Sequence, residues 1–349
     1  MEILSNATFT CERVDGAVPT FNITWTNRNI DIIDIKKIGG VVNNSTDYGA
    51  LSSKTLNMLR THTTLDKHQI ASARSALLKN KIIGNHNRMN LLVARIVPEY
   101  ETDGILAISR KYDFPPLNLL RGILLRKGYN TSKLHDIFVS KTNAANVLSA
   151  YDMQQYVAAE ANDAESMFDQ QMITDIAAAN ELAFVNYFRS LGITLKDENE
   201  LAAEQIESHG RMIATPDILF IDTVFINGTQ IAWLDYKDYI GTNVRFLYMS
   251  NVKQAHEYEE RWGQGAICYH YGFIAGMTIP GAMLLDAHAL PIKLQNKDVS
   301  TSIRINVIET SESKTSKSIK VNEVAGKKAT KGSSKKAESG AKSKAKQKT

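Results

Sequence analysis

The dipeptide Asn227-Gly228 constrains the fold of this chain more than any other short feature. It separates two runs of β-forming residues, 217–226 and 230–237. Asn-Gly between such runs is the strongest short-range signal for a two-residue hairpin, because both turn residues adopt positive φ. The hairpin brings the start of the first run level with the end of the second. It therefore predicts that Asp217 and Asp235 lie on neighbouring strands.

Alternation along the second strand decides which side chains share a surface. Asp235 and Lys237 point to one face, and Leu234 and Tyr236 point to the other. Mg²⁺ binds through one or two carboxylates plus phosphate oxygens and waters, and a neighbouring Lys can orient the attacking water. The pattern thus predicts a divalent-cation site with Asp217 and Asp235 as ligands, Lys237 as a catalytic group, and Mn²⁺ as an alternative ion.

A helix expected after residue 158, ending near Gly192, adds a third carboxylate. Its apolar stripe includes Glu181, which is spaced to share a face with Phe184 and Phe188. An isolated charge on such a stripe is costly, so this carboxylate must be paired, solvated in a cleft or bound to a metal. We expect Glu181 to serve as a further metal ligand.

A second helix, expected over 252–261, carries Gln254 and Tyr258 four residues apart on one face. Both follow the Asp-x-Lys strand and are placed to hydrogen-bond the phosphate or a metal-bound water. The Gln-x-x-x-Tyr spacing is weak evidence by itself. We count both as auxiliary catalytic residues.

Each part of this set also has an ordinary structural interpretation. Pro216-Asp217 and Asp-x-Lys arise by chance, and an acid and a base at a strand end often form only a salt bridge. Their conjunction around one hairpin is more specific. Three functions remain open: a metal-dependent nuclease, a binding module of the same fold that does not cleave, and a site whose metal is purely structural.

The order of expected elements describes an α/β fold. Helix, strand, strand, helix and strand follow one another from residue 156 to the apolar strand 266–274, which indicates a mixed sheet covered by helices. Residues before this part show mainly helical periodicity. The expected regions are an N-terminal extension (1–50), an all-α domain (51–155), the α/β domain with the site (156–308) and a tail (309–349).

Residues 104–129 resemble a helix-turn-helix. An amphipathic segment is followed by a break at 112–115, and Pro116 can open a second helix. Arg121, Arg126 and Lys127 give that helix a basic side suited to contact with nucleic-acid phosphates. Two helices with a short turn are also generic packing, and exposed cations are usually only solvated. Both interpretations stay open.

The charge of the chain is unevenly distributed. The total is +4, but after residue 313 there are twelve Lys against Glu323 and Glu338, which is +10 and leaves −6 for residues 1–313. No large apolar residue follows Val324, so this tail is expected to be disordered. A polylysine segment attracts phosphate backbones or serves as a nuclear import signal, and the plain alternative is a solubilising tail.

Several protein classes are disfavoured. No run approaches the roughly 18 apolar residues of a membrane-spanning helix, and the first residues lack a signal-peptide layout. Two cysteines, Cys11 and Cys268, are too few for a disulfide framework or a cysteine-built zinc site. We expect a nuclear or cytoplasmic protein, not a secreted or membrane protein, that is a monomer or a homodimer.

Pro216-Asp217 and Asp235-Tyr236-Lys237 resemble the PD-(D/E)XK nuclease superfamily. A closer resemblance is to the TPD-motif family of codanin-interacting nucleases, and it spans roughly residues 100–291. The segments that carry this resemblance are Thr215-Pro216-Asp217-Ile218-Leu219, Gln254-x-x-x-Tyr258, Trp262-Gly263-Gln264-Gly265 and Tyr269-His270-Tyr271-Gly272-Phe273-Ile274.

The resemblance implies a restriction-endonuclease-like mixed-sheet core preceded by an all-α, helix-turn-helix-like domain. It also implies Mg²⁺ dependence, a branched or structured nucleic acid as substrate, DNA more than RNA, and a codanin-like protein as a partner. Asp235 departs from the pattern, since Glu is expected there in the closest relatives and Asp is shorter by one methylene. The alternative is a catalytically weak or inactive nuclease-fold scaffold that binds a codanin-like protein or nucleic acid.

Overall fold

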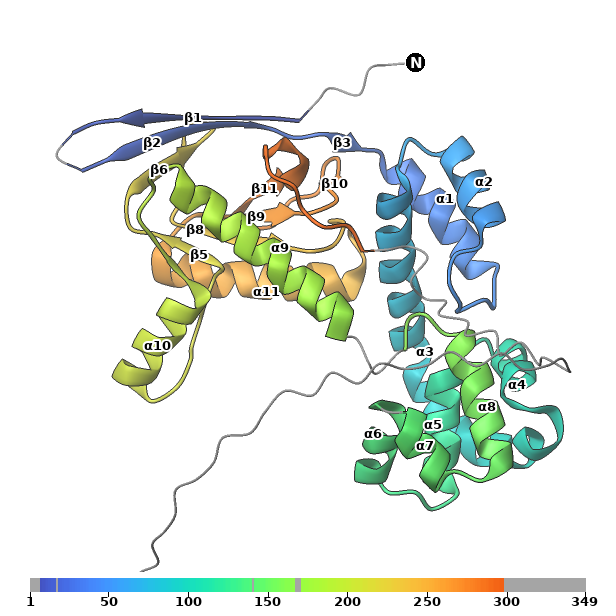
Figure 1. Cartoon of the computed structure of the whole chain (residues 1–349). Coiled ribbons are helices and arrows are strands. Elements are labelled where there is room, and N and C mark those ends of the chain that lie inside the picture. Colours follow the sequence, from blue (N-terminus) through green and yellow to red (C-terminus); the bar gives the residue numbers. More distant parts are fainter. Residues whose placement is uncertain (1–6, 17, 140, 167–170, 298–349) are drawn as a thin grey trace, which may run out of the picture. The chain divides into compact units, whose positions relative to one another are not determined.

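A five-stranded mixed sheet lies at the centre of the α/β part of the computed structural model, which describes residues 7–16, 18–139, 141–166 and 171–297 (Figure 1). In order, its strands are β11 (Ala282–Asp286), β9 (Gly265–Tyr269), β8 (Trp233–Lys237), β5 (Ile218–Phe220) and β4 (Leu195–Asp197). Neighbours among the first three are parallel, and the β8–β5 and β5–β4 pairs are antiparallel. A mixed α/β fold is therefore confirmed.

The predicted hairpin is present at Asn227-Gly228, where the two φ angles are 52° and 80°. It joins β6 (Thr223–Ile226) to β7 (Thr229–Gln230) in a second sheet. The flanking strands β5 and β8 pair with each other in the central sheet, with Ile218 opposite Leu234. One residue further along this register, Asp217 is level with Asp235, as the sequence predicts.

Residues 7–30 differ from the loosely specified extension expected from the sequence. Strands β1 (Thr8–Val14) and β2 (Thr20–Thr26) form a hairpin, and β2 pairs in parallel with β6, which gives a second mixed sheet in the order β1-β2-β6-β7. Trp25 is 1% exposed, and its Nε1 donates to the Asp286 carbonyl at 3.0 Å. This N-terminal segment is thus part of the α/β core.

The remaining short elements complete the α/β part. Strand β3 (Asn29–Ile30) pairs in parallel with β10 (Phe273–Ile274), and a 3₁₀ turn, Ala287–Ala289, follows β11. Most of the apolar run 30–38 lies in helix α1 (Ile32–Asn43). Asp31 caps this helix by accepting from Ile33 N, and Ile35, Ile38 and Val42 are buried at helical spacing.

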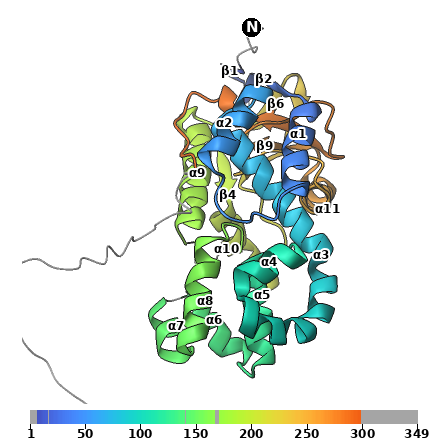
Figure 2. The ribbon, with the colours of Figure 1, turned by 90° about the vertical axis from the view of Figure 1, so that its right-hand side faces the viewer.

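Helices α9 (Gln171–Ser190) and α11 (Arg245–Trp262) cover opposite faces of the central sheet (Figures 1 and 2). Phe184 and Phe188 of α9 pack in one core with Tyr236, whereas Tyr258 of α11 packs with Trp233. The alternation expected along β8 is therefore confirmed. Side chains alternate along β8, so Asp235 and Lys237 lie on the same face of the sheet as Trp233. This is the face that α11 covers.

The helical periodicity expected from about residue 55 to 155 is confirmed, although strands and α1 precede it. The helices are α2 (Ser53–His62), α3 (Lys67–Asp103), α4 (Ile105–Tyr112), α5 (Pro116–Arg126), α6 (Thr131–Val139), α7 (Lys141–Val147) and α8 (Ala150–Ala161). The first half of α3 shares a core with Ile240 and Tyr271 of the α/β part, and its second half packs with α4, α5 and α8.

The predicted break between two helices at 112–115 is also present. Asp113 ends α4 in the left-handed conformation with φ 51°, and Pro116 opens α5. The expected disordered tail, 309–349, lies outside the described residues. Among the helices that are described, none is long and apolar enough to cross a membrane.

Candidate functional site

Two buried carboxylates lie on neighbouring strands: Asp217 directly precedes β5, and Asp235 is within β8, two residues before its end. They are 8% and 2% exposed. The backbone N–H of Tyr236 donates to Asp217 Oδ2 at 2.5 Å, and Gln254 Nε2 donates to Asp235 Oδ1 at 3.3 Å. The hairpin and the strand register therefore place both acids together, on the side of the sheet that α11 covers.

Lys237 supplies the positive charge beside them. Its ammonium forms an ion pair with Asp235 Oδ2, and its side chain is 16% exposed. Burial alone would lower the pKa of Lys237. The charge of Asp235, its hydrogen bond with Lys237 and the nearby Tyr239 and Asp217 together outweigh burial and raise the pKa above its ordinary value. Lys237 is thus cationic at neutral pH and oriented toward the carboxylates.

Glu181 reaches the same place from α9, together with a further carboxylate, Glu198. One carboxylate oxygen from each of Glu181, Glu198 and Asp217 lies within 4.8 Å of the other two. Burial raises the pKa of Asp217 well above its ordinary value, and Asp235 and Glu181 raise it further. Burial and then Glu198 likewise raise the pKa of Glu181.

Glu198 is not predicted as a site residue from the sequence. It is the first residue of α10 (Glu198–His209), which begins with a capping box between Asp197 and Glu200. The Asp-x-x-Glu spacing is a local signal for that helix start. Its nearness to Asp217 has another cause, because Asp197 pairs with Ile218 across β4 and β5, which places the next residue opposite Asp217.

Gln254 and Tyr258 form a short hydrogen-bonded chain behind Asp235. Gln254 Nε2 also donates to the Tyr258 hydroxyl at 2.9 Å, and that hydroxyl donates to the Thr215 carbonyl at 3.0 Å. Tyr258 is buried, and burial raises its pKa. The structure thus brings Gln254 to Asp235 directly, while Tyr258 holds Gln254 in position.

The three basic residues predicted to contact nucleic acid have different surroundings. Arg126 is exposed and Arg121 is half-buried. Lys127 instead donates to both carboxylate oxygens of Asp152, at 2.8 and 3.0 Å, and to Glu101 at 3.0 Å. Because Asp152 is 1% exposed, the charge of Lys127 is committed to a buried acid. The structure gives Lys127 an internal partner in place of the free basic face that the sequence suggests.

The carboxylates and Lys237 form a donor set that can hold a hard cation. Three acids, Asp217, Glu181 and Glu198, converge on a partly desolvated place. Asp235, which is on the strand next to Asp217, pairs with the Lys237 ammonium. Burial, and after it the charge of neighbouring acids, raises the pKa values of Asp217 and Glu181. A divalent cation with oxygen ligands would relieve the repulsion between these acids.

Comparisons with known proteins place this set within one family match. A family model described as a protein of unknown function with a TPD sequence motif matches residues 148–288. A similar curated protein is an uncharacterized protein of Acanthamoeba polyphaga mimivirus, 33% identical over 122 residues, which are 34% of this chain and 41% of that protein. The chain therefore matches less than half of that relative's length. No solved structure matches the chain.

Proposed function

We propose that the protein is a divalent-metal-dependent nuclease with a restriction-endonuclease-like core of the PD-(D/E)XK type. The observation that carries this proposal is the convergence of Asp217, Asp235 and Lys237 at neighbouring strand ends. Glu181, from the opposite helix, and Glu198 complete the acidic set. The residues fit Mg²⁺, or Mn²⁺ as an alternative, because every candidate ligand is a carboxylate oxygen.

Asp217, Asp235 and Glu181 would hold the cation. When bound, such a cation neutralises phosphate charge and lowers the pKa of a water molecule. Lys237 holds its ammonium beside Asp235, where it can orient a water and offset negative charge that develops on the phosphate. The Gln254 amide fixes one oxygen of Asp235 and leaves the other facing Lys237.

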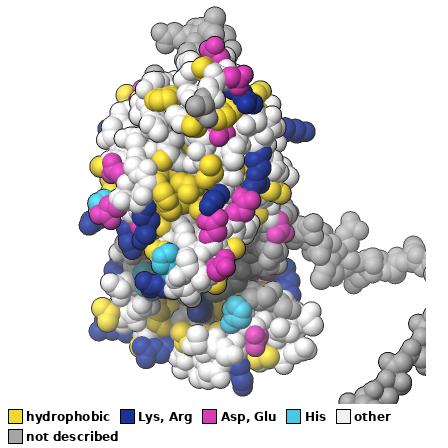
Figure 3. Space-filling view, turned by 90° about the vertical axis from the view of Figure 1, so that its left-hand side faces the viewer, with side chains coloured by type: hydrophobic (Ala, Val, Ile, Leu, Met, Phe, Trp, Pro, Cys, Tyr) yellow, Lys and Arg dark blue, Asp and Glu magenta, His cyan; other side chains and the backbone are white. Residues whose placement is uncertain are grey.

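Nucleic acid as the substrate is supported by basic residues outside this acidic set. Arg121 and Arg126 on α5 and the twelve Lys of the tail are the proposed phosphate contacts. Figure 3 shows one face on which acidic and basic side chains are interspersed around a hydrophobic patch. In this proposal the basic tail attracts the substrate, a branched DNA, and the protein acts in the nucleus or cytoplasm.

One observation favours a second function, that of an inactive nuclease-fold scaffold. Asp235 is already paired with Lys237, and Asp217 already accepts from Tyr236 N, so both acids have partners without a cation. A scaffold of this kind would bind nucleic acid or a codanin-like protein through other surfaces. The two functions differ in whether the acids act on a phosphodiester.

A cleavage panel separates them. The full chain is incubated with branched, single-stranded and duplex DNA and with RNA, each with Mg²⁺, Mn²⁺ or a chelator. The nuclease proposal expects metal-dependent cleavage of at least one substrate, with cleavage lost and binding retained in Asp217→Ala. Binding by the wild-type protein without cleavage of any substrate would support the scaffold.

A further inference from the structure

A cavity of about 410 Å³ opens beside the candidate site, between α3, the segment that follows β8, and the start of α11. Its volume lies within the range of small-ligand sites. A nucleic-acid duplex does not fit into a cavity of this volume, because even its minor groove is about 6 Å wide and the whole duplex is wider still. Its aromatic walls are Tyr239, Phe246 and Tyr271.

Two of these rings are held in place by hydrogen bonds. The Tyr239 hydroxyl donates to Asn251 Oδ1 at 2.9 Å, and Asn251 Nδ2 donates to the Tyr269 hydroxyl at 2.9 Å. The Tyr271 hydroxyl accepts from Lys297 N at 3.3 Å, and the Tyr271 carbonyl accepts from Gln69 Nε2 at 3.0 Å. The cavity therefore offers fixed ring surfaces, which suit a flat ligand.

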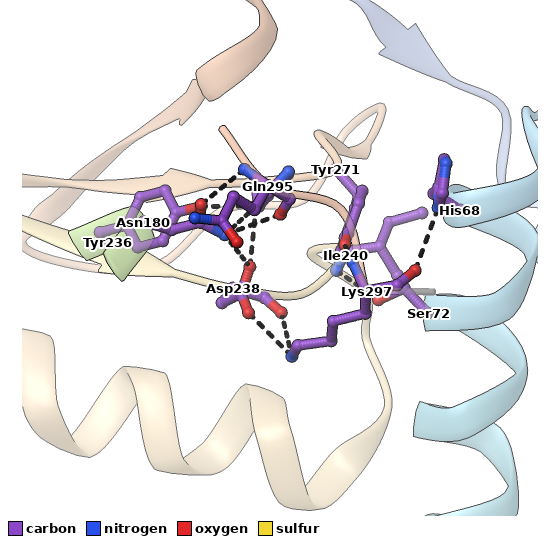
Figure 4. A network of polar contacts seen from close by, with 10 residues as sticks. His68, Ser72, Asn180, Tyr236, Asp238, Ile240, Tyr271, Gln295 and Lys297 are labelled. Atoms are coloured by element: carbon purple, nitrogen blue, oxygen red, sulfur yellow. Dashed lines mark hydrogen bonds and ion pairs between the residues drawn. The ribbon is translucent and has the colours of Figure 1, made fainter. Parts of the chain in front are cut away.

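Two of the cations along the same cavity face acidic side chains. Lys297 Nζ pairs with Asp238 Oδ2 at 2.9 Å (Figure 4), and the buried Arg74 faces Glu165. Ser72 Oγ accepts from Ile240 N at 3.0 Å, which leaves its own O–H to donate. Because two of the three lining cations face the two lining acids, the interior suits a neutral ligand with hydrogen-bonding edges better than a free phosphate. The third cation, the exposed Lys79, adds one positive charge to the lining.

One stripe of α11 connects the cavity with the candidate catalytic residues. Leu247 lines the cavity, Asn251 holds Tyr239, and Gln254 contacts Asp235; these three follow the i, i+4, i+7 spacing of one helix face. Leu247 and Gln254 are separated by about 10 Å along the helix, from a rise of about 1.5 Å per residue. That separation corresponds to about three stacked base steps of roughly 3.4 Å.

We propose that this cavity receives an unpaired nucleobase of the substrate strand, one to three nucleotides from the phosphate that Asp217, Asp235 and Lys237 act on. The inference rests on the proposed nuclease function and adds a substrate class to it, namely nucleic acid with an unpaired or extruded base. A paired base cannot enter, so the cavity favours branched, gapped or single-stranded substrates over continuous duplex. Lys79, an exposed residue of the cavity lining, is placed to contact the backbone of the same strand.

Fluorescence of 2-aminopurine tests this assignment. The probe base is placed in DNA either at an unpaired position or within a continuous duplex, and binding is measured with full-length protein carrying Lys237→Ala to prevent cleavage. Two further changes alter the cavity: Phe246→Ala removes a stacking surface, and Ala71→Phe fills the space from α3. Met249→Ala, exposed on α11, and Ala203→Phe, exposed on α10, are the matched controls.

We expect quenching of the unpaired probe on binding. Both cavity variants should weaken binding of that DNA by about 5- to 100-fold, the range for loss of one base–aromatic stack, and change duplex binding less than twofold. The controls should bind like the parent, and melting curves should show that all variants fold. Equal weakening for duplex and unpaired DNA, or no weakening by either cavity variant, would overturn the proposed base site.

Hydrolysis of bis(p-nitrophenyl) phosphate, which carries no base, distinguishes failure of the cavity from failure of the nuclease proposal. With Lys237 intact, the control variants Met249→Ala and Ala203→Phe should hydrolyse it at the wild-type rate. Absence of hydrolysis and of DNA cleavage by the wild-type protein removes the nuclease proposal. Selective loss of unpaired-base binding in the cavity variants still supports the cavity in that case.

Discussion

The buried negative charge that makes Asp217 a candidate metal ligand also destabilises the folded protein when no metal is bound. Burial, Asp235 and Glu181 raise the pKa of Asp217 in the folded protein. A carboxyl group with a raised folded-state pKa binds protons more tightly when folded, so its ionisation destabilises the fold. The metal-free protein should therefore lose stability as the pH rises from about 3.8, the ordinary value, through the raised pKa of this residue.

Asp217→Asn tests that relation at a single residue. The amide oxygen can still accept from Tyr236 N, but the buried charge is gone. At pH 7.5 in a chelator, the free energy of unfolding should increase by about 1 to 3 kcal/mol, and the gain should shrink toward pH 4. Urea unfolding across this pH range measures it.

Added Mg²⁺ should stabilise the wild-type protein and leave Asp217→Asn unchanged. Asp222→Asn is a matched control, because the Asp222 carboxylate accepts from Thr194 N rather than joining the acidic cluster. A metal-free Asp217→Asn protein that is less stable than wild type at pH 7.5 would contradict the destabilising role given to this charge.

Lys127 and Arg126 are adjacent cations with different expected roles. Burial would raise the pKa of Asp152, but hydrogen bonds from Lys127, Tyr100 and Ser149 outweigh it and lower the pKa. Lys127→Met leaves this buried acid without its cation, although Tyr100 and Ser149 still donate to it. Loss of one partner of a buried ion pair costs about 3 to 5 kcal/mol. The cost should be full at pH 7 and decline as the pH falls through the lowered pKa of Asp152.

Arg126→Met, on the exposed side of the same helix end, should change the free energy of unfolding by less than about 0.5 kcal/mol. It should weaken DNA binding, whereas Lys127→Met should weaken binding only as far as it unfolds the protein. Thermal unfolding and DNA titration of both variants measure this difference. Equal stability of the two variants would show that the Lys127–Asp152 ion pair contributes little.

At the scale of elements, the sequence predicts what depends on local spacing. Asn227-Gly228 predicts the turn between β6 and β7, and the Gln254–Tyr258 spacing predicts one face of α11. Local spacing does not show that β6 pairs with β2 outside the central sheet, because that pairing joins residues about 200 positions apart. Glu198 escapes prediction for the same reason, since it reaches Asp217 through the β4–β5 pairing.

Strand β9 approaches the Trp233 ring too closely for any side chain at its first residue. A Cβ placed on Gly265 would lie 1.9 Å from Trp233 Cε2. Gly265→Ala should therefore force the ring or the strand to shift, at a cost of about 1 to 3 kcal/mol from overpacking. Because β9 neighbours β8, the rate of any phosphodiester cleavage should fall as well.

Gly40→Ala is the matched control for that substitution. Gly40 lies within α1, and a Cβ there would meet nothing within 4 Å. Alanine should stabilise this helix by about 0.5 to 1 kcal/mol relative to glycine. Denaturant unfolding of both variants decides the prediction, which fails if Gly265→Ala is as stable as wild type.

For the whole molecule, the candidate site depends on segments from both ends of the described chain. Residues 20–30 supply strands to two sheets, and the buried Asp286 binds Arg28 at 2.9 Å. Helix α3 packs with Ile240 and Tyr271 as well as with the other helices. The family model matches residues 148–288, and residues well outside that range therefore also support the elements that carry the acids of the site.

The tail is basic and the rest of the chain is acidic. We therefore predict that the tail contributes to DNA binding but not to phosphodiester hydrolysis. Replacing the twelve Lys after residue 313 with Gln keeps the tail length and removes its charge. DNA binding should weaken, and the slope of log affinity against log salt should become smaller, by about 0.9 for each duplex phosphate that the tail no longer neutralises. Hydrolysis of bis(p-nitrophenyl) phosphate should be unchanged. An unchanged salt slope would assign the binding of DNA phosphates to other residues.

The most direct measurement is the initial rate of Mg²⁺-dependent cleavage of branched DNA by the wild type, Lys237→Ala and Lys253→Ala. Lys253 is exposed on α11, so it controls for loss of a lysine near the site. We predict that Lys237→Ala lowers kcat by about 10²- to 10³-fold with little change in KM, and that Lys253→Ala matches the wild type. Cleavage by Lys237→Ala at the wild-type rate would contradict the catalytic role proposed for Lys237.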